Sequence, residues 1–254
     1  MPKNYYLTER DVLALSICFK FRVVTEDQLH ILCNFPTLKR TRERLRLLSD
    51  RGYLKRTKAL TDTSFCCTGT QKASDYLGIN IKPYKLSLAT LKHELSIVDI
   101  AMYMFLRGEA TGLNQIMTDR ELFYYGSTKN IKNIGNIHRP DLLLLDNKMI
   151  VECEKTLKSK NRYLKHVIEN ALHYKNYKQI WILWDNLLAM PEHLKKEFTK
   201  RNINYEIIYI SEMQKYIKSH LTDKFSLYLD EDFGSALNNY DLLLANKKER
   251  RIDD

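Results

Sequence analysis

The chain has 254 residues, of which 44% are hydrophobic and 28% charged, a composition that suits one large globular domain or two small ones and excludes a disordered or fibrous protein. Its 41 Lys and Arg residues outnumber its 31 Asp and Glu residues, so the formal net charge is +10 and nucleic acid is the first partner to consider. No apolar run approaches the roughly 18 residues of a membrane span. The charged N-terminus and five cysteines without CxxC spacing indicate an unprocessed cytoplasmic protein with reduced thiols.

Three short helices are predicted in the first fifty residues, because each has a recognisable start. Thr8 precedes a run of apolar residues, and Thr25 is followed three residues later by Gln28, which is the pattern of a capping box. Thr37 can cap a third helix, and Gly52 occupies the position that usually follows a helix end.

Two short extended runs, residues 53–58 and 64–68, follow the third helix and are joined by a polar turn. A short amphipathic helix over residues 70–77 comes next. Three helices followed by a two-stranded wing are typical of a winged helix-turn-helix, so we predict such a DNA-binding domain over residues 1–80.

Positive charge is concentrated on the third helix and the first wing strand. Residues 37–58 contain nine basic and two acidic side chains, a net of +7. A recognition helix in the major groove and a wing along the backbone need this placement, because phosphate contacts supply most of the salt-dependent affinity. The alternative is a solvated helix face. The residues predicted to contact DNA here are Lys39, Arg40, Arg42, Arg44, Arg46, Lys55, Arg56 and Lys58.

A second domain is predicted over residues 86–254, after a linker at 80–85 that contains Pro83. We expect helices over 86–107, 158–178 and 191–201, and strands near Leu122, Leu142, Ile150, Ile182 and Ile207. Short connections between the first three strands predict an antiparallel meander, and the later strand-helix-strand unit predicts parallel additions with helices packed on the sheet. The chain is therefore expected to be an α/β protein with a mixed sheet flanked by helices.

Three carboxylates occur at the ends of two of these strands. Asp141 precedes one strand, and Glu152 and Glu154 share a face of the next because alternate side chains of a strand point the same way. Like charges this close need a partner, and oxygen ligands suit Mg²⁺ or Mn²⁺. The alternative is a pair of glutamates at a strand end held by the neighbouring Lys and Arg residues.

These residues resemble two known patterns. Pro140-Asp141, a hairpin and Glu152-x-Glu154 are similar to the PD-(D/E)xK metal-dependent nucleases, which implies a restriction-endonuclease-like fold for the second domain. The run from Glu152 to Tyr163 resembles the signature of the replication-relaxation family, which includes MobC-type plasmid mobilisation relaxases with an N-terminal winged helix.

The resemblance implies roles for individual residues. Asp141, Glu152 and Glu154 would bind the metal, Lys158 would face the scissile phosphate, and Glu121 would be a further acidic residue of the site. His93 resembles a histidine on the family's preceding helix. Strand alternation directs Lys155 away from the two glutamates, so Lys158 is preferred as the catalytic cation, and Lys160 and Arg162 near the same helix start suit phosphate contacts.

We therefore expect a metal-dependent, site-specific nicking endonuclease of the relaxase type, which acts in plasmid mobilisation or replication on double-stranded DNA such as an origin-type site. Assembly as a homodimer or with other DNA-processing proteins is compatible with this expectation. The alternative is a non-catalytic replication or transcription regulator whose nuclease-like domain is a scaffold. The adjacent tyrosines Tyr124 and Tyr125 are expected to pack in the core or in a strand rather than to act as nucleophiles, and the basic residues 247–251 to be solvated.

Overall fold

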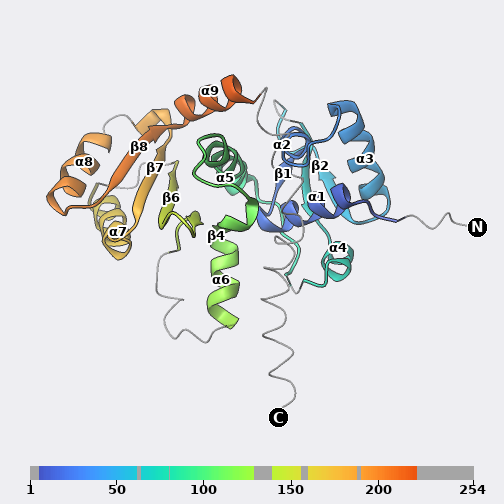
Figure 1. The fold of residues 1–254 in the computed structure, drawn as a ribbon, viewed down its shortest axis with the longest axis horizontal. Coiled ribbons are helices and arrows are strands. Elements are labelled where there is room, and N and C mark those ends of the chain that lie inside the picture. Colours follow the sequence, from blue (N-terminus) through green and yellow to red (C-terminus); the bar gives the residue numbers. More distant parts are fainter. Residues whose placement is uncertain are drawn as a thin grey trace, which may run out of the picture. The chain divides into compact units, whose positions relative to one another are not determined.

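The computed structural model describes residues 6–61, 64–79, 81–128, 139–155, 160–187 and 190–221, apart from the side chains of 124–128, 160–166 and 190–191. In these ranges the protein is a mixed α/β structure with nine α-helices, a three-stranded antiparallel sheet and a five-stranded mixed sheet (Figure 1). Two compact units are present, and the division falls between Val98 and Asp99. None of the described helices combines the length and apolar character needed to cross a membrane.

The first unit contains the predicted three helices, two strands and short helix in the predicted order, together with a short strand over Val24–Thr25 that was not predicted. Its elements are α1 (Glu9–Lys20), β1 (Val24–Thr25), α2 (Glu26–Leu32), α3 (Leu38–Asp50), β2 (Leu54–Thr57), β3 (Cys66–Gly69), α4 (Gln71–Tyr76) and the first half of α5 (Leu88–Leu106). The sheet order is β1-β3-β2, and both pairs are antiparallel. The predicted caps are confirmed: the side chains of Thr8, Thr25 and Thr37 accept backbone N–H groups at the starts of α1, α2 and α3, and Gly52 has the positive φ of 77°.

Helix α1 packs closely against strand β3. A Cβ atom at Gly69 would lie 2.5 Å from the ring of the fully buried Phe19, so a larger residue at this end of the strand requires the Phe19 ring to shift. The first half of α5 belongs to the same unit, because Leu91 and Leu95 cluster with Val23 and Cys66. The sequence analysis placed this half of the helix in the second domain.

The five cysteines are free and buried. Burial raises the pKa of all five thiols above that of an exposed cysteine. Because the thiolate is the reactive form, we expect the native protein to show almost no reaction with a disulfide reagent within minutes at pH 8, and five thiols to react after unfolding in guanidinium. A fast-reacting thiol in the native protein would contradict the packing around that cysteine.

The second unit contains the mixed sheet. Its elements after α5 are β4 (Ile116–Thr118), α6 (Asp119–Thr128), β5 (Leu142–Leu144), β6 (Met149–Glu154), α7 (Lys160–His173), β7 (Lys178–Leu183), α8 (Met190–Lys200), β8 (Tyr205–Tyr209) and α9 (Ile210–His220). The strand order is β4-β5-β6-β7-β8, with antiparallel pairs from β4 to β6 and parallel pairs from β6 to β8. The predicted antiparallel pairing of the first three strands and the parallel pairing of the later ones are therefore confirmed, but β4 and β5 are separated by helix α6, where a short connection was predicted.

Two predicted elements of this unit are wrong. Leu122 lies in α6 and not in a strand, because Thr118 caps this helix: the Glu121 carboxylate accepts the Thr118 N–H at 2.8 Å, and the Thr118 hydroxyl accepts the Glu121 N–H at 3.3 Å. The same helix contains Tyr124 and Tyr125, for which we had expected packing in the core or in a strand.

Helix α7 was expected to reach residue 178 but ends at His173. Gln179, a fully buried residue of β7, donates its side-chain amide to the carbonyls of Ala171 and Tyr174 at 2.7 and 3.0 Å. These bonds satisfy carbonyls that the helix end leaves without partners, so the chain can turn into the strand.

Helices α7 and α8 cover one face of the parallel strands. Trp181 and Leu183 of β7 form a buried cluster with Ile168 of α7 and with Leu194 and Phe198 of α8. Trp181 is thus a core residue, and Trp184 follows the strand and packs against this cluster, partly buried.

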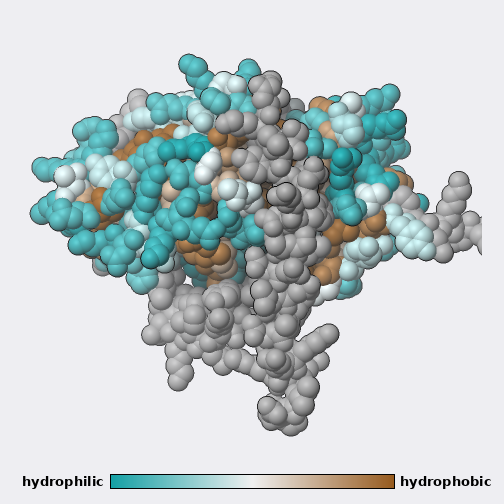
Figure 2. All heavy atoms as spheres, viewed as in Figure 1, coloured by the Kyte–Doolittle hydropathy of each residue, from teal (hydrophilic) through white to brown (hydrophobic). Residues whose placement is uncertain are grey.

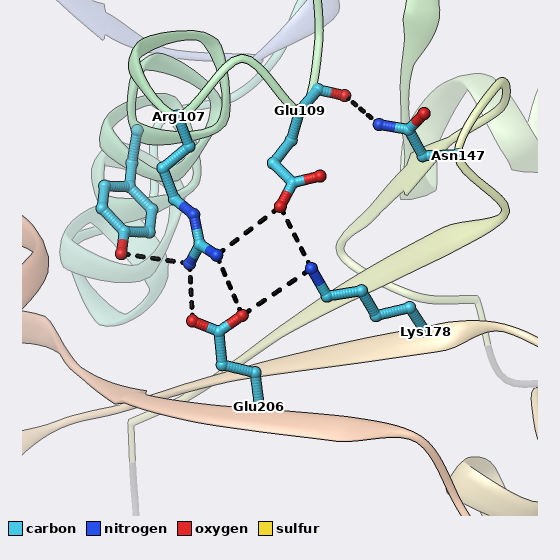
Figure 3. Close-up of polar contacts among 6 residues, drawn as sticks. Arg107, Glu109, Asn147, Lys178 and Glu206 are labelled. Atoms are coloured by element: carbon cyan, nitrogen blue, oxygen red, sulfur yellow. Dashed lines mark hydrogen bonds and ion pairs between the residues drawn. The ribbon is translucent and has the colours of Figure 1, made fainter.

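A network of charged side chains surrounds the turn that joins β5 to β6 (Figure 3). Arg107 donates two hydrogen bonds to Glu206 of β8 at 2.6 and 3.0 Å, and Lys178 of β7 lies 3.0 Å from Glu109. Asn147, in the hairpin turn, donates its side-chain amide to the Glu109 carbonyl at 2.6 Å. Hydrogen bonds to Glu206 raise the pKa of Arg107. The cations Arg107 and Lys178 balance the carboxylates of Glu109 and Glu206, and the Asn147 hydrogen bond attaches the hairpin turn to this network.

Candidate functional site

The first unit presents a row of cations on the outer face of α3. Thr41, Leu45 and Leu48 point into the core and are fully buried, so the opposite face of the helix, which carries Arg40, Arg42 and Arg46, points outward. Six of the cations predicted to contact DNA are exposed: Lys39, Arg40, Arg42 and Arg46 on α3, Lys55 on β2, and Lys58 just after it. Figure 2 has the same view as Figure 1, and the surface that it shows over α3 is mainly hydrophilic.

Two other predicted DNA-contacting residues have partners inside the unit. Arg44 donates its Nε to the carboxylate of Asp11 at 2.6 Å, and the Asp11 side chain is completely buried. Arg56 donates its Nε to Glu26 at 2.7 Å, and Glu26 is 1% exposed. These guanidinium groups neutralise buried carboxylates, so the charge count of the sequence overstates the charge that is available to a ligand.

Two of the outer cations, Arg40 and Arg46, have weak ion-pair partners on the same helix. Arg40 lies 3.7 Å from Glu43 and Arg46 lies 3.8 Å from Asp50, and both arginine side chains are 75% exposed. Ion pairs of this kind contribute at most about 1 kcal/mol to stability. A phosphate can therefore replace the carboxylate at little cost.

In the second unit, the sheet places the three predicted carboxylates on neighbouring strands. Leu142 of β5 pairs with Val151 of β6, so Asp141 lies at the β5 end next to Glu152. Glu152 and Glu154 pair with Trp181 and Leu183 of β7, the residues that face α7 and α8. The predicted shared face of the two glutamates is therefore confirmed.

The carboxylates lie around Cys153. Asp141 accepts the backbone N–H of Cys153 at 2.7 Å. The pKa of the Cys153 thiol is raised first by burial and then by the negative charges of Asp141, Glu154 and Glu152. All three carboxylates are thus within electrostatic reach of one residue, and Glu152 is only 7% exposed.

A cation that the sequence analysis missed lies near this group. The guanidinium of Arg139 lies 5.0 Å from the ring centre of Phe123, and its buried Nε has no hydrogen-bond partner among the described residues. Burial and the charge of Glu152 raise the pKa of Tyr174 to about 12, and Arg139 acts on the same hydroxyl in the opposite direction. Its place directly before Pro140-Asp141 is the signal that could have found it.

The described side chains do not form a metal site. In the part of the chain that the structure describes, no group of three or more His, Cys, Asp or Glu side chains is placed to hold a metal ion. Asp141, as noted, is directed to the Cys153 amide. Binding of Mg²⁺ or Mn²⁺ by Asp141, Glu152 and Glu154 therefore stays a prediction.

The remaining predicted site residues are distributed as follows. Lys158 lies outside the described residues, and Lys160 and Arg162 lie in the first turn of α7, where the side chains are not described. Lys155 lies 5.7 Å from the ring centre of Trp184. Glu121 closes the capping box of α6, and His93 lies half-buried on α5.

Comparisons with known proteins identify no relative of this chain. The chain matches no family model, no curated protein and no solved structure. The assignment of function therefore depends on the residues and contacts described above.

Proposed function

We propose that this chain binds double-stranded DNA through its first unit, with α3 in the major groove and the β2–β3 hairpin along the backbone. The order α1-β1-α2-α3-β2-β3 and the sheet order β1-β3-β2 support a winged helix-turn-helix. The observation that carries the proposal is the sorting of charge on α3: the inward-facing Arg44 is neutralised by buried Asp11, whereas the outward-facing cations remain exposed.

Replacement of Arg40 and Arg46 by Ala tests this proposal. If both contact phosphate, the affinity for a duplex oligonucleotide should fall and the slope of log Kd against log salt should decrease by about two units, because each lost contact releases about one counterion fewer. Fluorescence anisotropy titrations at four or more salt concentrations give this slope.

A matched control is Lys195→Ala, which removes an exposed cation from α8 in the other unit. This variant should bind DNA with the slope of the unmodified protein. An equal change in both variants would show that only net charge matters, and an unchanged slope in the Arg40/Arg46 double variant would reject α3 as the recognition helix.

We further propose that the second unit is a restriction-endonuclease-like domain that nicks the bound DNA. The order of antiparallel and parallel strands and the juxtaposition of Asp141 and Glu152 on neighbouring strands support this proposal. The resemblance between residues 152–163 and a relaxase signature also supports it. A plasmid origin-type site is the substrate that this resemblance favours, and a non-catalytic DNA-binding regulator is the alternative.

A further inference from the structure

Glu26 connects three elements of the first unit. It is the first residue of α2, and its carboxylate is almost completely inaccessible. Arg56 of β2 donates to Oε1 at 2.7 Å, and Arg42 of α3 lies 3.6 Å from Oε2. A buried carboxylate is stable only when it is paired, so α2, β2 and α3 are held together at this point.

The second strand of the hairpin is attached at the same place. The backbone N–H of Glu26 donates to the carbonyl of Phe65 at 3.0 Å, and the N–H of Asp27 donates to the hydroxyl of Ser64 at 3.4 Å. The Arg56 guanidinium also lies 4.7 Å from the ring centre of Phe65. Both strands of the hairpin are therefore fastened to the N-terminus of α2.

One of these groups is also an exposed cation of the DNA-binding surface. The side chain of Arg42 is 52% exposed and lies 3.6 Å from Asp27 as well as from Glu26. Its position on the surface depends on the two acidic residues at the start of α2. The contacts of Glu26 and Asp27 with Arg42 and Arg56 thus fix the position of the hairpin relative to this part of α3.

We propose that Glu26 is a positioning residue for DNA binding, which holds the β2–β3 hairpin and α3 as one preformed surface. This inference rests on the proposed function. A surface that is already ordered avoids the cost of ordering during association, so the loss of Glu26 should weaken binding even though Glu26 itself does not face the DNA.

The direction in which Glu26→Gln changes DNA affinity distinguishes a positioning role from simple electrostatics. Glu26→Gln removes one negative charge from a surface that binds a polyanion, so electrostatics alone predicts tighter binding. Positioning predicts the opposite: about tenfold weaker binding, with the salt slope unchanged because the phosphate contacts are still made. Glu43→Gln is the matched control, since it removes an exposed carboxylate of α3 and should bind DNA as tightly as the unmodified protein or more tightly.

The experiment measures the Kd of the full-length protein for a duplex oligonucleotide at several salt concentrations, with the fold of each variant checked by circular dichroism. If Glu26→Gln does not fold, Arg56→Lys replaces it, because lysine keeps the charge but has a single side-chain nitrogen, whereas Nε and Nη2 of Arg56 both contact Oε1 of Glu26; this variant should also bind about tenfold more weakly. Unchanged or tighter binding by the folded variant would overturn the proposal. Absence of DNA binding by the unmodified protein would instead reject the proposed function.

Discussion

Replacement of Arg44 by Ala should lower the free energy of unfolding by about 3–5 kcal/mol, because it leaves the buried carboxylate of Asp11 without its cation. Asp11 also accepts hydrogen bonds from the backbone N–H and the hydroxyl of Thr8, at 2.7 and 2.9 Å, so the same carboxylate caps α1. Urea denaturation followed by circular dichroism measures the change.

Arg46→Ala is the control for this prediction. Arg46 lies two residues further along α3, is 75% exposed and forms a weak ion pair with Asp50, so its loss should change the free energy of unfolding by less than about 1 kcal/mol. For DNA binding we expect Arg46→Ala to have the larger effect: the slope of log Kd against log salt should be lower for Arg46→Ala than for folded Arg44→Ala. Equal destabilisation by the two variants would contradict the distinction between inward and outward arginines.

Local signals were sufficient to predict most of the first unit. The caps at Thr8, Thr25 and Thr37 act within four residues of the chain, and the sequence shows them directly. The same kind of signal at Thr118 and Glu121 was missed, because the apolar and aromatic residues after it favoured a strand.

Contacts between distant residues were not predictable in the same way. Nothing near Arg44 or Arg56 in the sequence shows that they pair with Asp11 and Glu26, which lie 33 and 30 positions away. Charge counting therefore treated these arginines like the exposed ones. In the second unit, alternation predicted the shared face of Glu152 and Glu154, whereas the hydrogen bond that turns Asp141 to Cys153 depends on the pairing of β5 with β6.

Substitution of the carboxylates at the β5–β6 strand ends should have the largest effect on activity. We expect the unmodified protein to nick supercoiled plasmid in the presence of Mn²⁺ or Mg²⁺, and Glu152→Gln and Asp141→Asn each to reduce the rate by about 10²-fold or more, with DNA affinity retained. Each variant keeps the shape of the side chain and removes its charge, so the comparison tests whether negative charge at this sheet edge is needed. Gel analysis of plasmid topology over time, with and without a chelator, measures the rate.

Asp146→Asn provides the matched control, because Asp146 is an exposed carboxylate in the turn of the same hairpin, where it accepts a hydrogen bond from Gln115 at 2.7 Å. It should nick at the unmodified rate. If Glu152→Gln and Asp141→Asn nick as fast as Asp146→Asn, the acidic group at the strand ends has no part in the chemistry. If the unmodified protein binds the plasmid but leaves it supercoiled with either metal ion, the second unit is a scaffold and the chain is a DNA-binding regulator, since binding through α3 does not depend on charge in the other unit.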